Sequence, residues 1–310
     1  MNVEEILDLL TKASKDLSNF PYDRILNAIN SITISDLFGV RVPKGQVVLR
    51  ARPSKGKDFS NIEEVSYPKS TIAFGRANRP SNPMFYGAIT SKPEENYLDQ
   101  LVLLFLELLE LKRTNITSEG EKKLTVGRWF NDEDLFVFVM IFHEEYLKKN
   151  SHLIEGFHNY LDIIKQSSNN ISQLQILKFI AADFAKSNIN SDNDYKISAA
   201  FVESMLKKSL IKIDGIIYPS VRCEGEYFNI ALTPECVDSK MSLHEVVTTT
   251  VYYKNKVVIN DYEKEAFLKP GEKDFYLSDI IDPNYHYGRT RILKALDEEV
   301  KKYYEIKKIE

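Results

Sequence analysis

Apolar residues recur every three to four positions near the amino terminus, which is the spacing of one face of an α-helix. One apolar stripe runs over residues 3–17, and a second runs over residues 25–32. The two stripes predict a small helical lead-in over residues 1–40.

The pattern changes at residue 47. Residues 47–49 are strand-like, and the chain up to about residue 90 has short apolar segments between Pro, Ser, Asn and Gly, which predicts strands joined by structured loops. A strongly apolar helix is expected over residues 97–112. β-Branched and aromatic runs over 122–130 and 135–142 predict further strands.

Helical spacing returns over about residues 144–208, with a polar loop at 187–195. Strands are expected over 213–221 and 227–232, followed by a hairpin that turns around residues 254–256 and a last helix over 288–304. Because strands and helices come in separate groups, the pattern predicts an α+β fold with helical additions.

The composition excludes several classes of protein. With 43% hydrophobic and 28% charged residues, the 310-residue chain can form one large core or two smaller ones. A net charge of −4 attracts neither nucleic acid nor an anionic membrane. The longest apolar run, 101–111, is too short to span a bilayer, and the acidic, amphipathic amino terminus is unlike a secretion signal. We therefore expect a cytoplasmic protein.

Metal and cofactor motifs are absent from the sequence. Cys223 and Cys236 make no zinc or disulfide framework, and the five histidines are scattered. The chain has no Gly-x-x-x-x-Gly-Lys-Ser/Thr loop and no Gly-x-Gly-x-x-Gly motif, and Ser220 lacks the Gly-x-Ser-x-Gly elbow of α/β-hydrolases. We expect no metal ligand and no cofactor.

Two arginines stand out in "VVLRARP". Arg50 and Arg52 are two residues apart, so they lie on the same face of a strand, where they repel unless a carboxylate or an anionic ligand lies between them. Paired arginines suit a diphosphate. The alternative is a solvated edge strand with two surface arginines.

The segment "FGRANRPSNPMFYGA" adds Arg76, Asn78, Arg79 and Tyr86 on a loop whose prolines indicate a fixed path. Tyr86 is either a core aromatic or a flat ring on which a heteroaromatic ligand stacks.

Glu107, and Glu110 one turn later, interrupt the apolar helix. A carboxylate in that setting pairs with an arginine, takes part in chemistry, or belongs to an exposed polar stripe. In the hairpin predicted over 213–232, Ser220 directly follows Pro219, and Asn229 lies close by in the sequence.

Taken in order, "LRARP", "GRANRPSNPMFYGA", the helix with Glu107 and "DGIIYPSVRCEGEYFNIAL" resemble the RES domain family, named for an Arg, a Glu and a Ser. The resemblance covers about residues 47–240. The matching residues are Arg50, Arg52, Gly75, Arg76, Asn78, Pro80, Tyr86, Tyr218, Pro219, Ser220, Gly225 and Asn229.

The glutamate departs from the family pattern. The family places it about a dozen residues after the Tyr, where this chain has Tyr97 and then Asp99, so the assignment to Glu107 requires an insertion. Its rivals are Glu94, Glu95, Asp99 and Glu110.

The resemblance implies a split β-sheet core like that of ADP-ribosyltransferases. It divides the chain into the lead-in 1–40, a catalytic domain 41–245 with a helical insertion at about 144–208, and a hairpin and helix over 246–310 packed on the same domain. It also implies an activity that destroys NAD by hydrolysis or phosphorolysis, with NAD as substrate, in a bacterial toxin or defence effector held by an antitoxin.

In this interpretation Glu107, Arg50 and Ser220 are catalytic, and NAD is contacted by Arg52, Arg76, Asn78, Tyr86 and Asn229. Two alternatives share the pocket: a catalytically silent NAD-binding module, and an enzyme that transfers ADP-ribose to a macromolecule. An antitoxin or a second copy in a homodimer can dock on the helices of 1–40 and 144–208, although amphipathic helices more often belong to the core.

Overall fold

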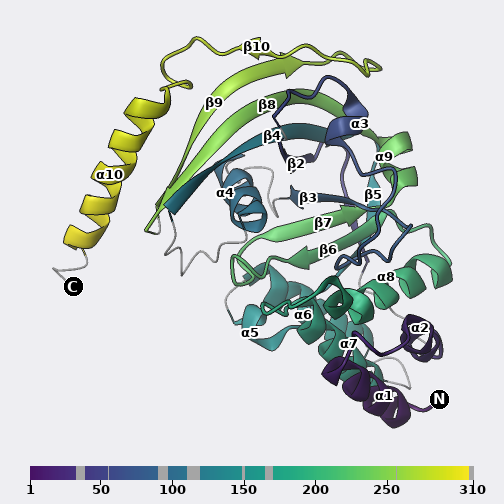
Figure 1. The fold of residues 1–310 in the computed structure, drawn as a ribbon. Coiled ribbons are helices and arrows are strands. Elements are labelled where there is room, and N and C mark those ends of the chain that lie inside the picture. Colours follow the sequence, from purple (N-terminus) through teal and green to yellow (C-terminus); the bar gives the residue numbers. More distant parts are fainter. Residues whose placement is uncertain are drawn as a thin grey trace. The chain divides into compact units, whose positions relative to one another are not determined.

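The computed structural model describes residues 1–32, 39–54, 56–89, 97–109, 119–148, 151–164, 170–255 and 257–306 (Figure 1). It confirms the mixed α+β class. The chain forms two compact units, each built from three separate segments. Unit 1 comprises Met1–Gln46, Tyr67–Tyr86 and Asp132–Lys240, and unit 2 comprises Val47–Ser66, Gly87–Asn131 and Met241–Glu310.

Unit 1 begins with the predicted helical lead-in. Helix α1 (Val3–Lys15) starts at a capping box: the backbone N–H of Glu5 donates to Oδ1 of Asn2, and the backbone N–H of Asn2 donates to Oε2 of Glu5, both at 2.9 Å. Helix α2 (Tyr22–Asn30) follows. The apolar stripes read from the sequence are the buried faces of these helices, because their members Ile6, Leu10, Ile25 and Ile29 are at most 1% exposed.

The helices predicted over 144–208 are present as α5 (Glu144–Leu147), α6 (Ser151–Ile164), α7 (Asn170–Phe184), the 3₁₀ turn η1 (Asp192–Tyr195) and α8 (Lys196–Lys208). Buried Lys196 joins α8 to the lead-in, since its Nζ donates to the backbone oxygens of Leu17 at 2.7 Å and Phe20 at 3.1 Å. A further helix, α9 (Pro234–Lys240), was not predicted, because seven residues are too few to show a helical period.

The sheet of unit 1 has the strand order β1-β5-β6-β7. Its strands are β1 (Gly39–Val42), β5 (Leu135–Val139), β6 (Gly215–Pro219) and β7 (Phe228–Leu232). β5 and β6 run parallel, and the other neighbours run antiparallel. All five residues of β6 are buried, which explains its continuous apolar sequence.

The sheet of unit 2 consists of antiparallel strands in the order β3-β2-β4-β8-β9-β10. Their bounds are β2 (Val47–Pro53), β3 (Phe85–Ile89, of which 87–89 belong to this unit), β4 (Glu119–Asn131), β8 (Met241–Lys254), β9 (Val257–Phe267) and β10 (Ser278–Asp279). The predicted hairpin is confirmed, since β8 and β9 pair on either side of Asn255, whose φ is +45°.

The described part of unit 2 also contains the helices α3 (Ile62–Val65), α4 (Tyr97–Leu108) and α10 (Arg289–Ile306). The last helix, yellow in Figure 1, packs on the long hairpin through Ile292 and Leu296 against Tyr252. Its start is held by the buried carboxylate of Asp261, which accepts hydrogen bonds from the backbone of Tyr287 and Gly288 at 2.6 and 2.9 Å. In the part of the chain described, no helix is long and apolar enough to cross a membrane.

Candidate functional site

The loop that precedes β3 is closed by its own side chains. The backbones of Gly75 and Asn78 pair as an isolated antiparallel β-bridge. The side-chain amide of Asn78 donates to two backbone oxygens of the same loop. The hydroxyl of Tyr86 donates to Oδ1 of Asn78 at 2.7 Å and accepts from the backbone amide of Ala77 at 2.9 Å. The loop is therefore rigid without a ligand.

Gly75 is required by this arrangement. A Cβ at this position would overlap Oδ1 of Asn78 and would lie 2.7 Å from the hydroxyl of Tyr86. The Gly, Asn and Tyr of the sequence motif thus have a structural explanation: the hydroxyl of Tyr86 binds the side chain of Asn78, and both lie so close to Gly75 that no side chain fits there. Tyr86 as a whole is half-buried, and its hydroxyl holds the loop.

Arg76 is held by the end of a helix. Its guanidinium donates to the backbone oxygens of Phe184 and of Lys186, the latter at 2.9 Å, and lies 5.1 Å from the ring centroid of Tyr195. A cation at this end of α7 satisfies carbonyl groups that have no partner within the helix. The fold of unit 1 therefore uses the guanidinium that the sequence assigned to NAD.

The β6–β7 hairpin explains why a serine follows Pro219. Ser220 is fully buried, and its backbone N–H donates to Tyr227 at 2.7 Å while its carbonyl accepts from Gly225 at 2.8 Å. Its Oγ also accepts from the backbone N–H of Cys223 at 3.3 Å, as Ser does in turns. Within the described contacts, the hydroxyl of Ser220 stabilises the corner of the hairpin.

The same hairpin places Asn229 directly opposite Tyr218 in the strand ladder, next to this corner. Gly225 in the turn has φ +88°, and a Cβ there would lie 2.5 to 2.8 Å from the ring of Tyr146. Unit 1 thus contains two groups of site residues predicted from the sequence: the loop with Arg76, Asn78 and Tyr86, and the hairpin with Ser220 and Asn229.

In unit 2, Arg50 and Arg52 extend from the same face of β2, as their spacing predicts. Nε of Arg50 lies 3.2 Å from the backbone oxygen of Ser66, and Nη1 of Arg52 lies 3.4 Å from the same atom. β2 has a neighbour on each side, so the interpretation as an edge strand does not hold. One carbonyl oxygen at the end of α3 brings the two guanidiniums together. Arg50 is 8% exposed, and Arg52 is half-buried.

Glu107 lies on the other face of this sheet. Val126 of β4 is paired with Ala51 of β2, so both point away from the face that carries the two arginines. Lys122 is four residues before Val126 on β4, so its side chain points to the same face as that of Val126. Its Nζ donates to the backbone oxygen of Leu108, the last residue of α4, at 2.8 Å. Helix α4 therefore covers the face opposite to the arginines, and the sheet separates Glu107 from them.

The side chains of the other candidates for the catalytic carboxylate are not described by the structure. Glu94, Glu95 and Glu110 lie outside the described residues, as does the side chain of Asp99. Arg50, Arg52 and Glu107 belong to unit 2, whereas the other five predicted site residues belong to unit 1. Convergence of the two sets around one dinucleotide stays a prediction.

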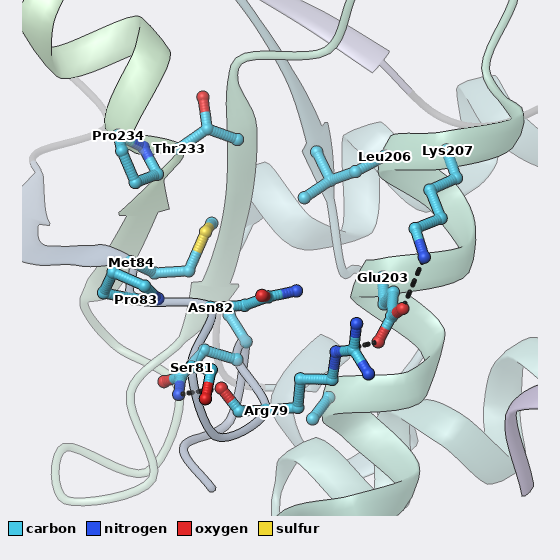
Figure 2. Close-up of a pocket in the computed structure, with 13 residues that line it drawn as sticks. Arg79, Ser81, Asn82, Pro83, Met84, Glu203, Leu206, Lys207, Thr233 and Pro234 are labelled. Atoms are coloured by element: carbon cyan, nitrogen blue, oxygen red, sulfur yellow. Dashed lines mark hydrogen bonds and ion pairs between the residues drawn. The ribbon is translucent and has the colours of Figure 1, made fainter. Parts of the chain in front are cut away.

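Unit 1 also contains a cavity of about 320 Å³ (Figure 2). Its wall is formed by the loop 77–84, by α8 and by the β7–α9 turn. Met84 and Leu206 provide apolar surface from opposite sides, and Arg79 and Lys207 both point toward Glu203. Of the residues that line this cavity, Asn78 and Arg79 stand out in the sequence as candidate site residues.

Glu203 organises the charges of this cavity. Its side chain is 8% exposed, and it forms ion pairs with Nε of Arg79 at 3.1 Å and Nζ of Lys207 at 2.6 Å. The hydroxyl of Tyr22 donates to it at 2.7 Å. Burial raises the pKa of Glu203, but the hydrogen bonds from Lys207 and Tyr22 and the charge of Arg79 outweigh it, so the pKa lies below its ordinary value. Burial and the hydrogen bond to Glu203 raise the pKa of Tyr22.

The sequence holds one signal for this network: Glu203 interrupts an apolar helical stripe and has Lys207 four residues later. Among the described residues, no group of three or more His, Cys, Asp or Glu side chains is placed to hold a metal ion. No protein-family model matches this chain, and no curated protein matches it in sequence.

Proposed function

We propose that this chain binds NAD and cleaves its nicotinamide–ribose bond, by hydrolysis or phosphorolysis, on an ADP-ribosyltransferase-like split-sheet core. The observation that supports the proposal most directly is the shared contact of Arg50 and Arg52 with the carbonyl oxygen of Ser66. Two guanidiniums held together on one sheet face provide several fixed donors for a diphosphate, which lysines would not reproduce.

Cleavage of this bond develops positive charge on the ribose, so a fixed carboxylate beside the ribose stabilises the transition state more than the ground state. Glu107 and Asp99 both lie on α4, which covers the face opposite to the arginines. Glu94, Glu95 and Glu110 therefore stay the other candidates for this carboxylate. Tyr86 offers a ring held by its hydroxyl for stacking on nicotinamide, and the hairpin corner at Ser220 offers a rigid wall.

A second candidate is an NAD-binding module without catalysis. The position of α4 favours it, because Arg50 and Arg52 can bind a diphosphate without a carboxylate that acts on the ribose. A third candidate, transfer of ADP-ribose to a macromolecule, requires the same pocket. In the first candidate, an antitoxin or a second copy of the chain is the partner that restrains the enzyme.

One experiment separates these candidates. The purified chain is incubated with NAD labelled in its adenine ring, with and without phosphate and with a cell extract. Free ADP-ribose, ADP-ribose phosphate and labelled macromolecules identify the three reactions. Binding without turnover, measured by calorimetry, identifies the silent module. If NAD neither binds nor turns over, the proposal is wrong.

Variants then assign the residues. Arg52→Lys retains the charge but loses the planar fork, so NAD affinity should fall about tenfold or more. Loss of the catalytic carboxylate should lower turnover by on the order of a hundredfold with NAD affinity retained, which can be tested in Glu94→Gln, Glu95→Gln, Asp99→Asn and Glu107→Gln. Arg24→Gln, on α2 of unit 1, serves as the matched arginine control.

A further inference from the structure

We propose that the cavity between the loop 77–84, α8 and the β7–α9 turn binds a small organic anion with an apolar body. Its anionic group, a carboxylate or a phosphate monoester, is held by Arg79 and Lys207. The site does not depend on the NAD proposal, because its charged residues differ from those assigned to NAD; Asn78 is the lining residue that the two proposals share.

The anionic group of the ligand would bind the N–H donors of Arg79 and Lys207 that do not contact Glu203. Glu203 faces Nε of Arg79 at 3.1 Å, and the described contacts of that guanidinium involve Nε rather than Nη1 or Nη2. These two nitrogens form the edge that binds a carboxylate or phosphate with two parallel hydrogen bonds. Lys207 has one contact with Glu203, so it keeps further N–H donors for a ligand.

Charge favours an anion over a cation or a neutral ligand. Two cations and one carboxylate line the cavity, which leaves one net positive charge. Glu203 is almost completely buried and already receives hydrogen bonds from Tyr22 and Lys207, so it is not available to a cationic ligand. Its function in the site is to orient the two cations.

The rest of the wall suits a compact apolar body. The larger apolar side chains of this wall are Pro83, Met84, Leu206 and Pro234 (Figure 2). A volume of about 320 Å³ lies at the lower end of the range of small-molecule sites, about 300–1,000 Å³. It is too small for a whole dinucleotide and large enough for a single ring with an anionic group.

The test uses the full chain labelled with ¹⁵N and four small probes: benzoate, phenyl phosphate, benzamide and benzylamine. Benzoate or phenyl phosphate should produce saturable shifts of the amide resonances of residues 79–82 and 203–207. Benzamide and benzylamine should bind at least about tenfold more weakly, because they cannot form charge-assisted hydrogen bonds with Arg79. The stronger of the two anions identifies the natural ligand as a carboxylate or a phosphate.

Arg79→Gln should weaken the anion about tenfold or more. The matched control is Arg41→Gln, which also removes an arginine–carboxylate pair from unit 1, the one with Asp134, and should leave the affinity unchanged. The side chain of Lys207 is 63% exposed, and Lys207→Gln gives a second test.

The proposal is overturned if benzamide binds as tightly as benzoate, if neither anion gives saturable shifts, or if Arg79→Gln and Lys207→Gln both bind like the wild type. Arg52→Lys should retain anion binding here even where it abolishes NAD binding, so failure of either proposal can be recognised separately.

Discussion

The hydroxyl of Tyr86 donates a hydrogen bond to Oδ1 of Asn78 at 2.7 Å. Tyr86 is the second residue of β3, so this bond ties the start of the strand to the loop that precedes it. The hydroxyl oxygen of Tyr86 also accepts a hydrogen bond from the backbone N–H of Ala77. One hydroxyl thus satisfies an acceptor and a donor that are both partly buried, and it holds the loop that carries Arg76 and Arg79.

Tyr86→Phe should leave both of these groups without a partner. We expect the free energy of unfolding to fall by about 1–3 kcal/mol, because an unsatisfied polar group in a partly buried site loses its hydrogen bond without regaining water. Urea denaturation measures the loss, and amide exchange at Ala77 should accelerate. Tyr276→Phe, at a ring that is 87% exposed, is the control and should be close to neutral. Equal effects of the two variants would contradict the structural role of the hydroxyl.

Gly75→Ala should destabilise the chain by about 1–3 kcal/mol, because its Cβ overlaps Asn78 and Tyr86 in a loop that has no room to relax. Gly39→Ala is the matched control in the same unit, since its Cβ meets only one backbone oxygen, at 3.8 Å. Melting temperatures of the two variants give the comparison. A Gly75→Ala variant as stable as Gly39→Ala would show that the loop is not rigid.

Gly225→Ala and Gly45→Ala separate backbone strain from steric overlap. The two glycines have φ of +88° and +87°, but only Gly225 faces another side chain, the ring of Tyr146. Gly45→Ala should therefore cost about 1–2 kcal/mol, the penalty of the left-handed region alone. Gly225→Ala should cost more by a further 1–3 kcal/mol, the order of magnitude for overpacking. Equal losses in chemical denaturation would exclude the contact with Tyr146.

Glu203 should make the stability of the chain depend on acidic pH. Its pKa in the folded protein lies below the ordinary value of 4.5, so its stabilising contribution is present above pH 4.5 and is lost as the pH falls through the lower, folded value. Glu203→Gln should therefore be less stable than the wild type at neutral pH, and the difference should shrink below pH 4.5. Urea midpoints over this range test it, with Glu155→Gln on α6 as a control for the loss of one charge. A constant difference would contradict the ion-paired state of Glu203.

Cys223 and Cys236 should not react with iodoacetamide in the folded protein. They are 1% and 0% exposed, and burial together with the charge of Asp214 raises the pKa of Cys236 from 9.0 to about 12. Mass spectrometry should show no adduct in buffer and two adducts in urea. Modification of Cys236 under native conditions would show that the start of α9 opens.

Local patterns in the sequence were sufficient to predict the helices α1, α2 and α10 and the β8–β9 hairpin. In each of these elements, apolar residues recur with regular spacing over many positions, and turn residues lie where that spacing is interrupted. Helix α9 was missed because it has seven residues, too few for a period to show.

Residue spacing by itself determined that Arg50 and Arg52 share a face, because alternation along a strand is a local property. It could not determine that their common contact is the carbonyl of Ser66, that α4 carries Glu107 to the opposite face, or that Arg76 binds the end of α7. Those facts depend on which elements pack together, and packing depends on contacts between residues far apart in the chain. The charge network of Glu203 is of the same kind, since Tyr22, Arg79 and Lys207 meet only when three separate segments fold against one another.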